Sequence, residues 1–531
     1  MKDTTTPLGE AEGSRGPAGG ASSAGAPAGG ASMASSSLWA AVSLVATLGV
    51  QGLAALVILL IFGKSTDTDA VFAAYGVYGV IVLMCQSLRL TVVARLMESD
   101  SPWAAFDRFL GAGLSLVAIA IVAQLLFGAQ ISDVLTGDLG QEAQDTTRQT
   151  LDILCVAIAG QLIAALGAAV LATRGEFRLP GLVYVGGGLT SLVLLVALHG
   201  PLDITAAPVG VAVGSVLSAT LMIGRLWQEG YRPQVRSVLA GGRHVRLALM
   251  LLVGSIAPLL GQLNFVISLA FASHIGPGEV TLYTGAFFAG AVVVAVTGSA
   301  AGLVLAGPVA QSFTGDAPAL LPHLRTIMRA GLIVIGPTVA VAALVGDDLV
   351  QALLGASFTA ADADRMIGAF VALSGLYVAQ LALPLPLLAA FALSRYSAVA
   401  ALAAVGTAVH VAASAVALSL GGIVWLGVAA SVSSLTTTTL MLWLIHRSQV
   451  FRALGIVLRE TVVVGGVTAV AFVPPAVVAA LLGAGVWELV AAVVGLGVFA
   501  VALKFVLPQH AGVAMRMVAP VLPAGRRAAA A

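Results

Sequence analysis

Arg89 is the side chain best suited to chemistry, because it is the one charge inside the apolar run that extends from Asp67 to Arg95. A guanidinium at that position can extend along the helix to the membrane interface. It can instead face a water-filled cavity, where its planar fork can bind a phosphate through two N–H groups. The sequence leaves both roles open, and the second makes Arg89 the leading candidate for binding an anionic head group.

Other polar side chains inside apolar stretches are candidates for lining the same cavity: Gln51, Gln86, Gln262, Asn264 and Gln380. Hydrogen bonds between helices explain each of these amides equally well. Asp69 is also a candidate ligand, although capping a helix N-terminus is its simpler role. Three histidines are candidates for proton coupling, with a structural role as the simpler explanation: His199, His274 and His410.

No enzyme constellation is present in the sequence. The motifs G-x-x-x-x-G-K-[ST], H-E-x-x-H and C-x-x-C do not occur, and the seven histidines are scattered. Cys85 and Cys155 both lie in apolar stretches, which is typical of small core residues and implies neither a disulfide nor a metal. We therefore expect a protein that is not an enzyme, holds no cofactor or metal, and binds no nucleic acid.

The composition is typical of a membrane protein. Charged residues make up only 9% of the 531 residues, whereas hydrophobic residues make up 59%, and the mean hydropathy is +1.04. A soluble domain carries about 25% charged residues. Apolar stretches long enough to cross a ~30 Å hydrocarbon core recur about fourteen times. They are residues 38–63, 69–95, 108–130, 149–173, 180–200, 205–226, 247–273, 280–309, 327–346, 367–393, 396–420, 423–445, 459–483 and 487–507.

Positive charges predict the orientation of these spans. If the N-terminus lies in the cytoplasm, the inner segments contain all of the 25 Lys and Arg residues except Lys64, Arg89, Arg148 and Arg365. The cytoplasmic loops of membrane proteins are enriched in Lys and Arg in this way. The excess of Arg over Lys indicates a GC-rich, bacterial genome. We therefore predict a multi-pass protein of the bacterial cytoplasmic membrane, with both termini in the cytoplasm.

The two halves of the chain resemble each other. V-G-V-A-V-G-S-V begins at Val209 and L-G-V-A-A-S-V-S at Leu426, while Asp69 and Glu279 open the second and eighth spans. Six spans separate the members of each pair, so the halves have the same orientation, as parallel repeats do. The predicted fold is an all-α polytopic membrane protein with two parallel six-helix lobes and a C-terminal helix pair.

The predicted parts follow from these spans. They are a disordered cytoplasmic tail (1–37), an N-lobe (38–226), a basic cytoplasmic linker (227–246), a C-lobe (247–445), a cytoplasmic loop (446–458), the helix pair (459–507) and a second cytoplasmic tail (508–531). The first tail is rich in Gly, Ala, Ser and Pro and cannot bury a core.

Several motifs resemble the MviN/MurJ family of lipid II flippases. Ile61-Phe62-Gly63, followed by Thr68-Asp69-Ala70-Val71-Phe72, is similar to the family's F-G…T-D-A-F-F sequence before its second helix. Further similar segments are Gln262–Asn264, Phe271–Ser273, Gly278–Tyr283, Arg178–Pro180 and Gly427–Ala429. By topology the resemblance covers nearly the whole chain, and the wider superfamily includes polysaccharide flippases and drug or cation antiporters. The resemblance implies a V-shaped pair of lobes around a central cavity that alternates access.

One feature of the family is missing. The resemblance implies a cationic cavity, with arginines on helices 1, 2 and 8 facing the diphosphate of the lipid. The matching positions here are uncharged: Leu48, Ala54, Val82 or Leu83, and Ala286. Arg89 is the nearest replacement, so the resemblance supports the fold and the general class more directly than the substrate.

The leading hypothesis is a flippase that moves a lipid-linked saccharide, such as lipid II or a polysaccharide precursor, from the inner to the outer leaflet. The expected partners are that substrate, membrane lipids, and either a coupling ion or the membrane potential. A drug or cation antiporter is the first alternative, but it would need an acidic site inside the membrane, and few acids lie there. A scaffold of the cell envelope that transports nothing is the second, supported by the missing arginines.

Overall fold

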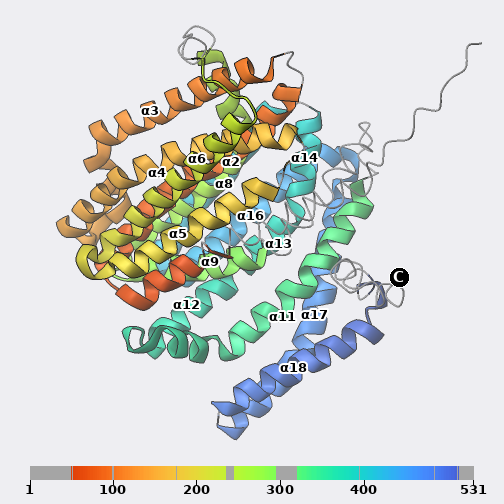
Figure 1. Cartoon of the computed structure of the whole chain (residues 1–531). Coiled ribbons are helices and arrows are strands. Elements are labelled where there is room, and N and C mark those ends of the chain that lie inside the picture. The colour runs from red at the N-terminus through yellow and green to blue at the C-terminus, as the bar shows by residue number, and fades with distance from the viewer. Residues whose placement is uncertain are drawn as a thin grey trace, which may run out of the picture.

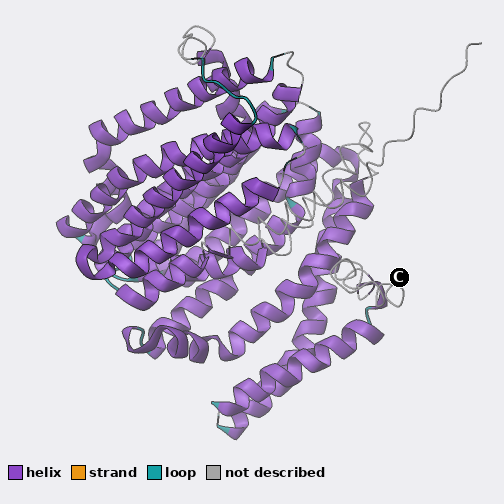
Figure 2. Cartoon of the chain, in the orientation of Figure 1, coloured by secondary structure: helices purple, strands orange, loops and turns teal. Residues whose placement is uncertain are grey.

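The computed structural model of the chain describes residues 49–50, 52–97, 101–174, 176, 178–234, 244–294, 320–393, 395–483, 485–510 and 512. These residues form helices and short connections, without any strand among them (Figures 1 and 2). Eight helical stretches in this part of the chain are long and apolar enough to cross a membrane, and three shorter apolar helices accompany them. The protein is therefore a multi-pass, all-α membrane protein.

The helices follow one another with short connections. Their bounds are Gly52–Phe62, α2 Thr66–Met97, α3 Pro102–Thr136, α4 Gln141–Thr173, α5 Arg178–Leu202, α6 Ala206–Gln228, α8 His244–Ser273, α9 Glu279–Val294, α11 Leu321–Leu354, α12 Ala360–Ala372, α13 Ser374–Ala382, α14 Pro384–Ala392, α15 Tyr396–Leu420, α16 Ile423–His446, α17 Val450–Leu482 and α18 Val486–Phe505. Short 3-10 helices lie at Gly137–Leu139, Asp203–Thr205, Gly355–Ser357 and Arg447–Gln449. Over its described residues each predicted span is helical except at an end, as at Gly63, Gly483 and Leu507, and only the tenth is interrupted internally.

Helices pack in the same order in both halves. In the first half, α2 and α6 both pack on α4, α3 packs on α4, and α5 packs on α6. In the second half, α9 and α11 pack on α12, α12 and α13 pack on α16, and α15 packs on α16. These pairs correspond if α2 matches α9, as the parallel repeat predicts.

Glycines let the two halves approach each other closely. A Cβ added to Gly76 of α2 would meet Leu269 of α8 at 2.7 Å, and one added to Gly79 would meet the Gln262 amide at 3.0 Å. A second close contact joins helix Gly52–Phe62 to α9, because a Cβ on Gly52 would meet Val292 at 3.0 Å. Small residues at such positions allow close backbone packing in membranes, where apolar burial supplies little driving force between helices.

The tenth predicted span, 367–393, is broken into α12, α13 and α14. At the first break, the Ser431 hydroxyl of α16 accepts a hydrogen bond from the Leu376 N–H (3.1 Å) and donates one to the Ala372 carbonyl (2.6 Å). The hydroxyl thus replaces the helical bond between these two groups, which is one recognised cause of a kink. The second break precedes Pro384, which has no N–H to donate.

The last two helices pack beside the second half. α17 and α18 pack on each other and on α11, and α18 lies on the opposite edge of the molecule from α3 (Figure 1). α17 begins at Val450, so most of the loop predicted over 446–458 is helical. Hydropathy detects only the apolar part of a helix, whereas good helix formers such as Leu, Ala and Arg extend it beyond the membrane.

The other predicted boundaries concern segments that the structure describes only in part. Residues 1–37 lie outside the described residues. Of the predicted linker 227–246, the first two residues complete α6 and the last three begin α8. Of the predicted tail 508–531, the described residues are 508–510 and 512. The division of the chain into these parts stays a prediction.

Candidate functional site

The buried carboxylate of Asp69, in the first turn of α2, holds the start of α9 in the other half. One oxygen accepts hydrogen bonds from the Thr281 N–H (2.7 Å) and hydroxyl (2.5 Å), and the other accepts from the Gly278 N–H (2.5 Å). Free N–H groups at a helix N-terminus are ordinarily capped by a side chain of the same helix. Here the cap comes from a helix more than 200 residues away in sequence, so it joins the halves.

An ion-pair cluster surrounds this cap. The Lys64 ammonium, in the turn before α2, lies 2.7 Å from an Asp362 oxygen at the start of α12. That oxygen also receives Arg365 (2.5 Å), and Arg365 in turn pairs with Glu279, the first residue of α9. Asp362 and Glu279 are both buried. Buried carboxylates require such partners, because an unpaired charge would lose its hydration without compensation.

A third contact between the halves lies at the surface. His274 Nδ1, just after α8, is 3.2 Å from an Asp138 oxygen in the connection between α3 and α4. Both side chains are exposed, so this pair contributes little to stability. We call the contacts of Asp69, Lys64 and Asp138 with the second half the Asp69 gate, and the end of the bundle where they lie the Asp69 end.

Local sequence features build the gate. Ser65 accepts a hydrogen bond from the Thr68 N–H and so caps α2. Asp69 is therefore free to cap α9. Gly278 has φ +84°, a conformation that favours glycine, and the Lys64 side chain packs where its Cβ would lie. At α12, Thr359 and Asp362 form a reciprocal capping box that fixes the Asp362 carboxylate.

An apolar cavity of about 820 Å³ lies between the halves next to the gate. Helix Gly52–Phe62, α9, α11 and α12 line it, and Leu496 of α18 contributes from the side. Thr338 is the one polar side chain among the lining residues. Ala286, at a position where the family resemblance implied an arginine, lines this cavity as well. The lining suits hydrocarbon and offers no partner to a charged group.

The remaining candidate residues lie at different levels of the bundle. Gln262 is half-buried against Gly79, on the contact between α8 and α2. At 1.5 Å per residue this level is about 15 Å along α2 from Asp69. Asn264 is also half-buried, and its side-chain oxygen is buried without a partner. Gln380 is half-buried in α13. Gln262 and Asn264 therefore lie at about the same depth along α8, whereas Asp69 lies in the gate.

Three candidates cannot be assigned a side-chain environment. The backbones of Gln86 and Arg89 belong to α2, with Arg89 about 30 Å along the helix from Asp69. Their side chains, and the whole of Gln51, lie outside the described residues. The binding roles predicted for these three residues stay predictions.

Sequence reasoning missed most of the gate. Lys64 and Arg365 were visible as two rare cations at the predicted outer side, and Asp362 as an acid of the same side. That signal, charges of both signs gathered on the side that should lack cations, could have indicated a cluster. Nothing in the sequence shows that Lys64 and Asp362, 298 residues apart, touch each other.

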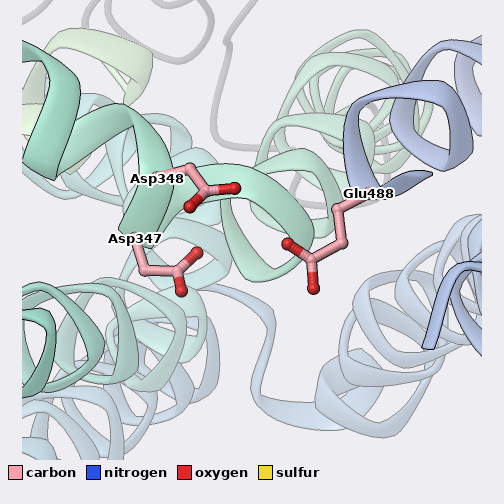
Figure 3. A group of neighbouring side chains, drawn as sticks. All are labelled: Asp347, Asp348 and Glu488. Atoms are coloured by element: carbon pink, nitrogen blue, oxygen red, sulfur yellow. The ribbon is translucent and has the colours of Figure 1, made fainter. Parts of the chain in front are cut away.

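Three carboxylates also converge at the periphery of the bundle. Asp347 and Asp348 of α11 and Glu488 of α18 have oxygens within 4.8 Å of one another (Figure 3). Asp347 and Asp348 belong to α11, which continues beyond the predicted span 327–346. Exposed acidic groups of this kind are common without a metal, and we assign no site to them.

At the opposite end, the chain after α6 is fixed to the first half. The buried Tyr231 phenol donates to Asp107 Oδ1 (2.6 Å) and packs edge-on against Phe106. Burial, and then the adjoining Asp107 carboxylate, raises the pKa of Tyr231, so the phenol stays protonated and keeps donating. Arg174 pairs with Glu229 next to this contact. The Gln234 N–H also donates to Asp107 (3.1 Å), so the segment to Gln234 is anchored to the first half.

Two helical halves that pack in the same order, bind each other at the Asp69 end and border an apolar cavity are the architecture of a two-lobed membrane transporter. A family model described as lipid II flippase MurJ matches residues 58–494. The chain therefore belongs to the MurJ lipid II flippase family. No curated protein sequence matches it significantly. A flippase family is a transport family, which agrees with the lack of catalytic motifs in the sequence.

Solved structures show the same fold. A structure described as lipid II flippase MurJ in an inward closed conformation is similar with a TM-score of 0.68 and 15% identity, over 90% of this chain and 98% of that chain. An inward-facing multidrug resistance MATE transporter is similar with a TM-score of 0.59 and 14% identity, over 78% and 95%. A MOP superfamily transporter from Pyrococcus furiosus follows with 0.56 and 15%, over 79% and 96%.

Proposed function

We propose that this protein moves a lipid-linked saccharide with a diphosphate head group between the leaflets of a bacterial cytoplasmic membrane by alternating access. The observation that carries the proposal is the Asp69 gate, because it holds the two halves together at one end through polar contacts that water can replace. Membership of a lipid II flippase family supports the class of substrate.

The distribution of charge supports an orientation. At the Asp69 end the described cations are Lys64, Arg148 and Arg365, and most other described Lys and Arg residues lie toward the opposite end. The positive-inside rule places the cation-rich end in the cytoplasm. The Asp69 gate is then the outer gate, both termini are cytoplasmic, and the substrate enters from the inner leaflet.

The cavity supports a lipid substrate. A saccharide diphosphate cannot cross hydrocarbon unaided, because burying its charges and hydroxyls costs many kcal/mol. A two-lobed protein can hydrate the head group between its halves while the lipid chain stays in an apolar environment. The 820 Å³ cavity beside the gate offers that environment to part of the chain.

The gate would open by exchanging its contacts for water. Moving α9 away from α2 releases the Gly278 and Thr281 N–H groups from Asp69 and separates Lys64 from Asp362. Each group becomes hydrated as it separates, so the net cost per hydrogen bond is about 0.5–3 kcal/mol. The cost of a single contact is similar to what the membrane potential supplies, about 2.3 kcal/mol per elementary charge moved through 100 mV.

Arg89 would supply the positive charge that this chain lacks at the positions matching the family's cavity arginines. Ala54, Val82 and Ala286 have apolar side chains, so none of these positions offers a partner to a phosphate. A guanidinium near the cytoplasmic end of α2 can meet a diphosphate entering from the inner leaflet and bind it through two donors.

The acids of the spans argue against the antiporter alternative. Asp69 and Glu460 are buried, but Asp69 caps α9, and Glu460 binds Arg329 and His510 (3.2 and 2.9 Å). Asp152 is exposed at its position on α4 and bonded to Gln124. Glu488 lies in the first turn of α18. A cation substrate would need a buried acid that is available to it.

Depletion in the native bacterium tests the proposal. Loss of the protein should leave lipid-linked saccharide precursors in the inner leaflet, so their labelling by a membrane-impermeant reagent from outside should fall severalfold while total precursor rises. Re-expression should restore the labelling. If depletion leaves every such precursor at its normal level on the outer surface, the flippase proposal is wrong and the scaffold alternative gains support.

A further inference from the structure

A pocket of about 580 Å³ opens on the surface of the first half where α6 ends, away from the Asp69 end. Gly224, Trp227 and Gln228 of α6 line it, together with Arg232 and Pro233 of the segment that follows. All of these residues except Gly224 are exposed, and a Cβ added to Gly224 would meet nothing within 4 Å. Neither the gate nor the apolar cavity includes any of them.

The pocket lies at the end of an apolar stripe on α6. The exposed residues of this helix recur every three or four positions: Val213, Val216, Leu217, Thr220, Leu221 and Trp227. This spacing places them on one helix face, which continues into the pocket through Gly224. α6 packs on α4 and α5 of its own half. The opposite face of α6 is therefore open to the acyl chains of the surrounding lipid.

Arg232 has donors that no described residue uses. Its Nη1 donates to the carbonyls of Trp227 (3.5 Å) and Tyr231 (3.0 Å), which fixes the guanidinium over the last turn of α6. A guanidinium has five N–H groups, so three remain on Nε and Nη2. Among the described residues no group accepts from these three, and none of the residues that line the pocket is acidic.

The amide of Gln228 is oriented by Arg225, which donates through Nη1 to Gln228 Oε1 (3.4 Å). Because an arginine can only donate, the atom that faces it must be the amide oxygen, and the N–H₂ group is left for another acceptor. Trp227 adds an indole N–H, which is also a donor. Three side chains of the pocket thus offer donors, from Arg232, Gln228 and Trp227.

The glutamates beside the pocket already have cationic partners. Glu229 pairs with Arg174 (2.6 Å) and Arg225 (2.7 Å), and Glu176 pairs with Arg225 (3.1 Å). Two arginines and two glutamates balance one another in this network. Arg232 therefore adds a positive charge that the network does not neutralise.

We propose that this pocket binds the phosphate of an anionic phospholipid whose acyl chains lie along the α6 stripe. A phosphate diester offers acceptors to a pocket that offers donors, and its charge matches that of Arg232. An amine head group would instead place a second cation beside Arg232, without an acid in the pocket to receive it. Tryptophan is enriched at the membrane interface, where lipid phosphates lie, and basic pockets at the cytoplasmic side bind anionic head groups.

The lipid in this pocket is distinct from the transported one. A transported head group must pass between the two halves, whereas the pocket lies on the outer face of one half. The leaflet is the inner one in the orientation proposed above. The site itself does not depend on which lipid the protein transports.

Native mass spectrometry of the full-length protein, released from detergent with added phosphatidylglycerol or phosphatidylcholine, tests the site. An arginine near the membrane surface favours an anionic lipid by about fivefold. We therefore expect the first phosphatidylglycerol to bind about fivefold more tightly than the first phosphatidylcholine. An excess of inorganic phosphate should not displace it, because phosphate lacks the acyl chains. Equal affinity for the two lipids, or displacement by phosphate, overturns the proposal.

Two variants assign the preference to the pocket, each measured in one solution with the wild-type protein, from which it differs in mass. Arg232→Gln removes the cation at an exposed position. Gly224→Leu keeps the cation and fills the pocket, and leucine is the better helix former. Each should bind phosphatidylglycerol about as weakly as phosphatidylcholine. The matched controls Arg452→Gln and Gly455→Leu change exposed residues of α17, also away from the Asp69 end, and should retain the preference.

The site requires that both pocket variants lose the preference and that both controls keep it. Loss in Arg232→Gln alone would show attraction by charge without a pocket, and loss in Gly224→Leu alone would show an apolar contact without a phosphate. Equal losses in the controls would show a preference spread over the whole basic end. Each of these results overturns the proposal, and none bears on the labelling of precursor that tests the flippase.

Discussion

At the scale of single residues, Asp69 holds two halves of the molecule with one carboxylate. Its oxygens accept three hydrogen bonds from Gly278 and Thr281, at the start of α9. The positive end of the helix dipole adds to the attraction. The sequence indicated a capping role for Asp69, but the helix that it caps belongs to the other half.

Asp69→Asn should open the gate. One side-chain oxygen becomes an N–H₂ group, which cannot accept from Thr281 or Gly278, so a buried donor loses its partner. The cost is about 2 kcal/mol, or more than a tenfold change in the ratio of closed to open gate. Spin labels at Gln141→Cys and Ala361→Cys, two exposed positions at the Asp69 end of the two halves, measure this ratio in a protein whose Cys85 and Cys155 are replaced by Ala. Asp67→Asn is the control, because Asp67 bonds only weakly to Thr146 within its own half (3.3 Å); equal effects of both variants would contradict the assignment.

Arg89→Ala should abolish transport while the protein reaches the membrane in normal amount. Arg89→Lys keeps the charge but loses the two-donor fork, so it should retain only part of the activity. The measurement is labelling of outer-leaflet precursor at equal membrane abundance. Arg95→Ala, in the last turn of the same helix, should retain most activity. Wild-type activity in Arg89→Ala would show that Arg89 only extends to the interface.

At the scale of helices, sequence and structure agree where the bilayer dictates the outcome. A polypeptide in hydrocarbon must satisfy its backbone polar groups internally, so a long apolar stretch is a helix whatever its neighbours are. The interruption after Ala372 did not follow from the local sequence, because the Ser431 hydroxyl that stabilises it comes from α16. The observed helix ends also differ from the predicted span ends. α17 and α11 continue into charged residues, which a search by hydropathy excludes.

The candidate site was predictable only in part. The sequence identifies Asp69 as a residue at a helix start, but not Thr281 as its partner 212 residues later. The apolar cavity was not predictable either, because Leu53, Val341 and Ile367 have the same side chains as ordinary core residues. Packing of distant helices, which no local pattern encodes, decides which apolar residues face a cavity.

Ser431→Ala tests the account of the interrupted helix. Without the hydroxyl, the Leu376 N–H and the Ala372 carbonyl either stay unpaired or draw together and straighten the segment, and each outcome costs about 1–3 kcal/mol. The apparent melting temperature in detergent should fall by several degrees. Ser419→Ala is the control, since Ser419 is exposed and bonds only to Val416 of its own helix. A fall no larger than that of the control would argue against the inserted hydroxyl.

At the scale of the whole molecule, the two halves are alike in helix packing but differ in their polar contacts at the Asp69 end. Asp69 and Glu279 open matching helices of the repeat, yet Asp69 caps α9 whereas Glu279 pairs with Arg365 of its own half. The repeat is thus symmetric in its packing and asymmetric in its polar contacts. Such asymmetry lets one end close through specific bonds while the halves keep a common architecture.

The central claim is that the halves must separate at the Asp69 end during transport, and a reversible cross-link tests it most directly. Asp138→Cys and His274→Cys place thiols on the exposed pair that joins the halves, and leave the buried contacts of Asp69 and Lys64 intact. Cys85 and Cys155 are replaced by Ala in the same protein. A short bifunctional thiol reagent with a reducible link should stop the appearance of labelled precursor in the outer leaflet, and a reductant should restore it, with each single-cysteine variant unaffected. Continued transport by the fully cross-linked protein would contradict the account.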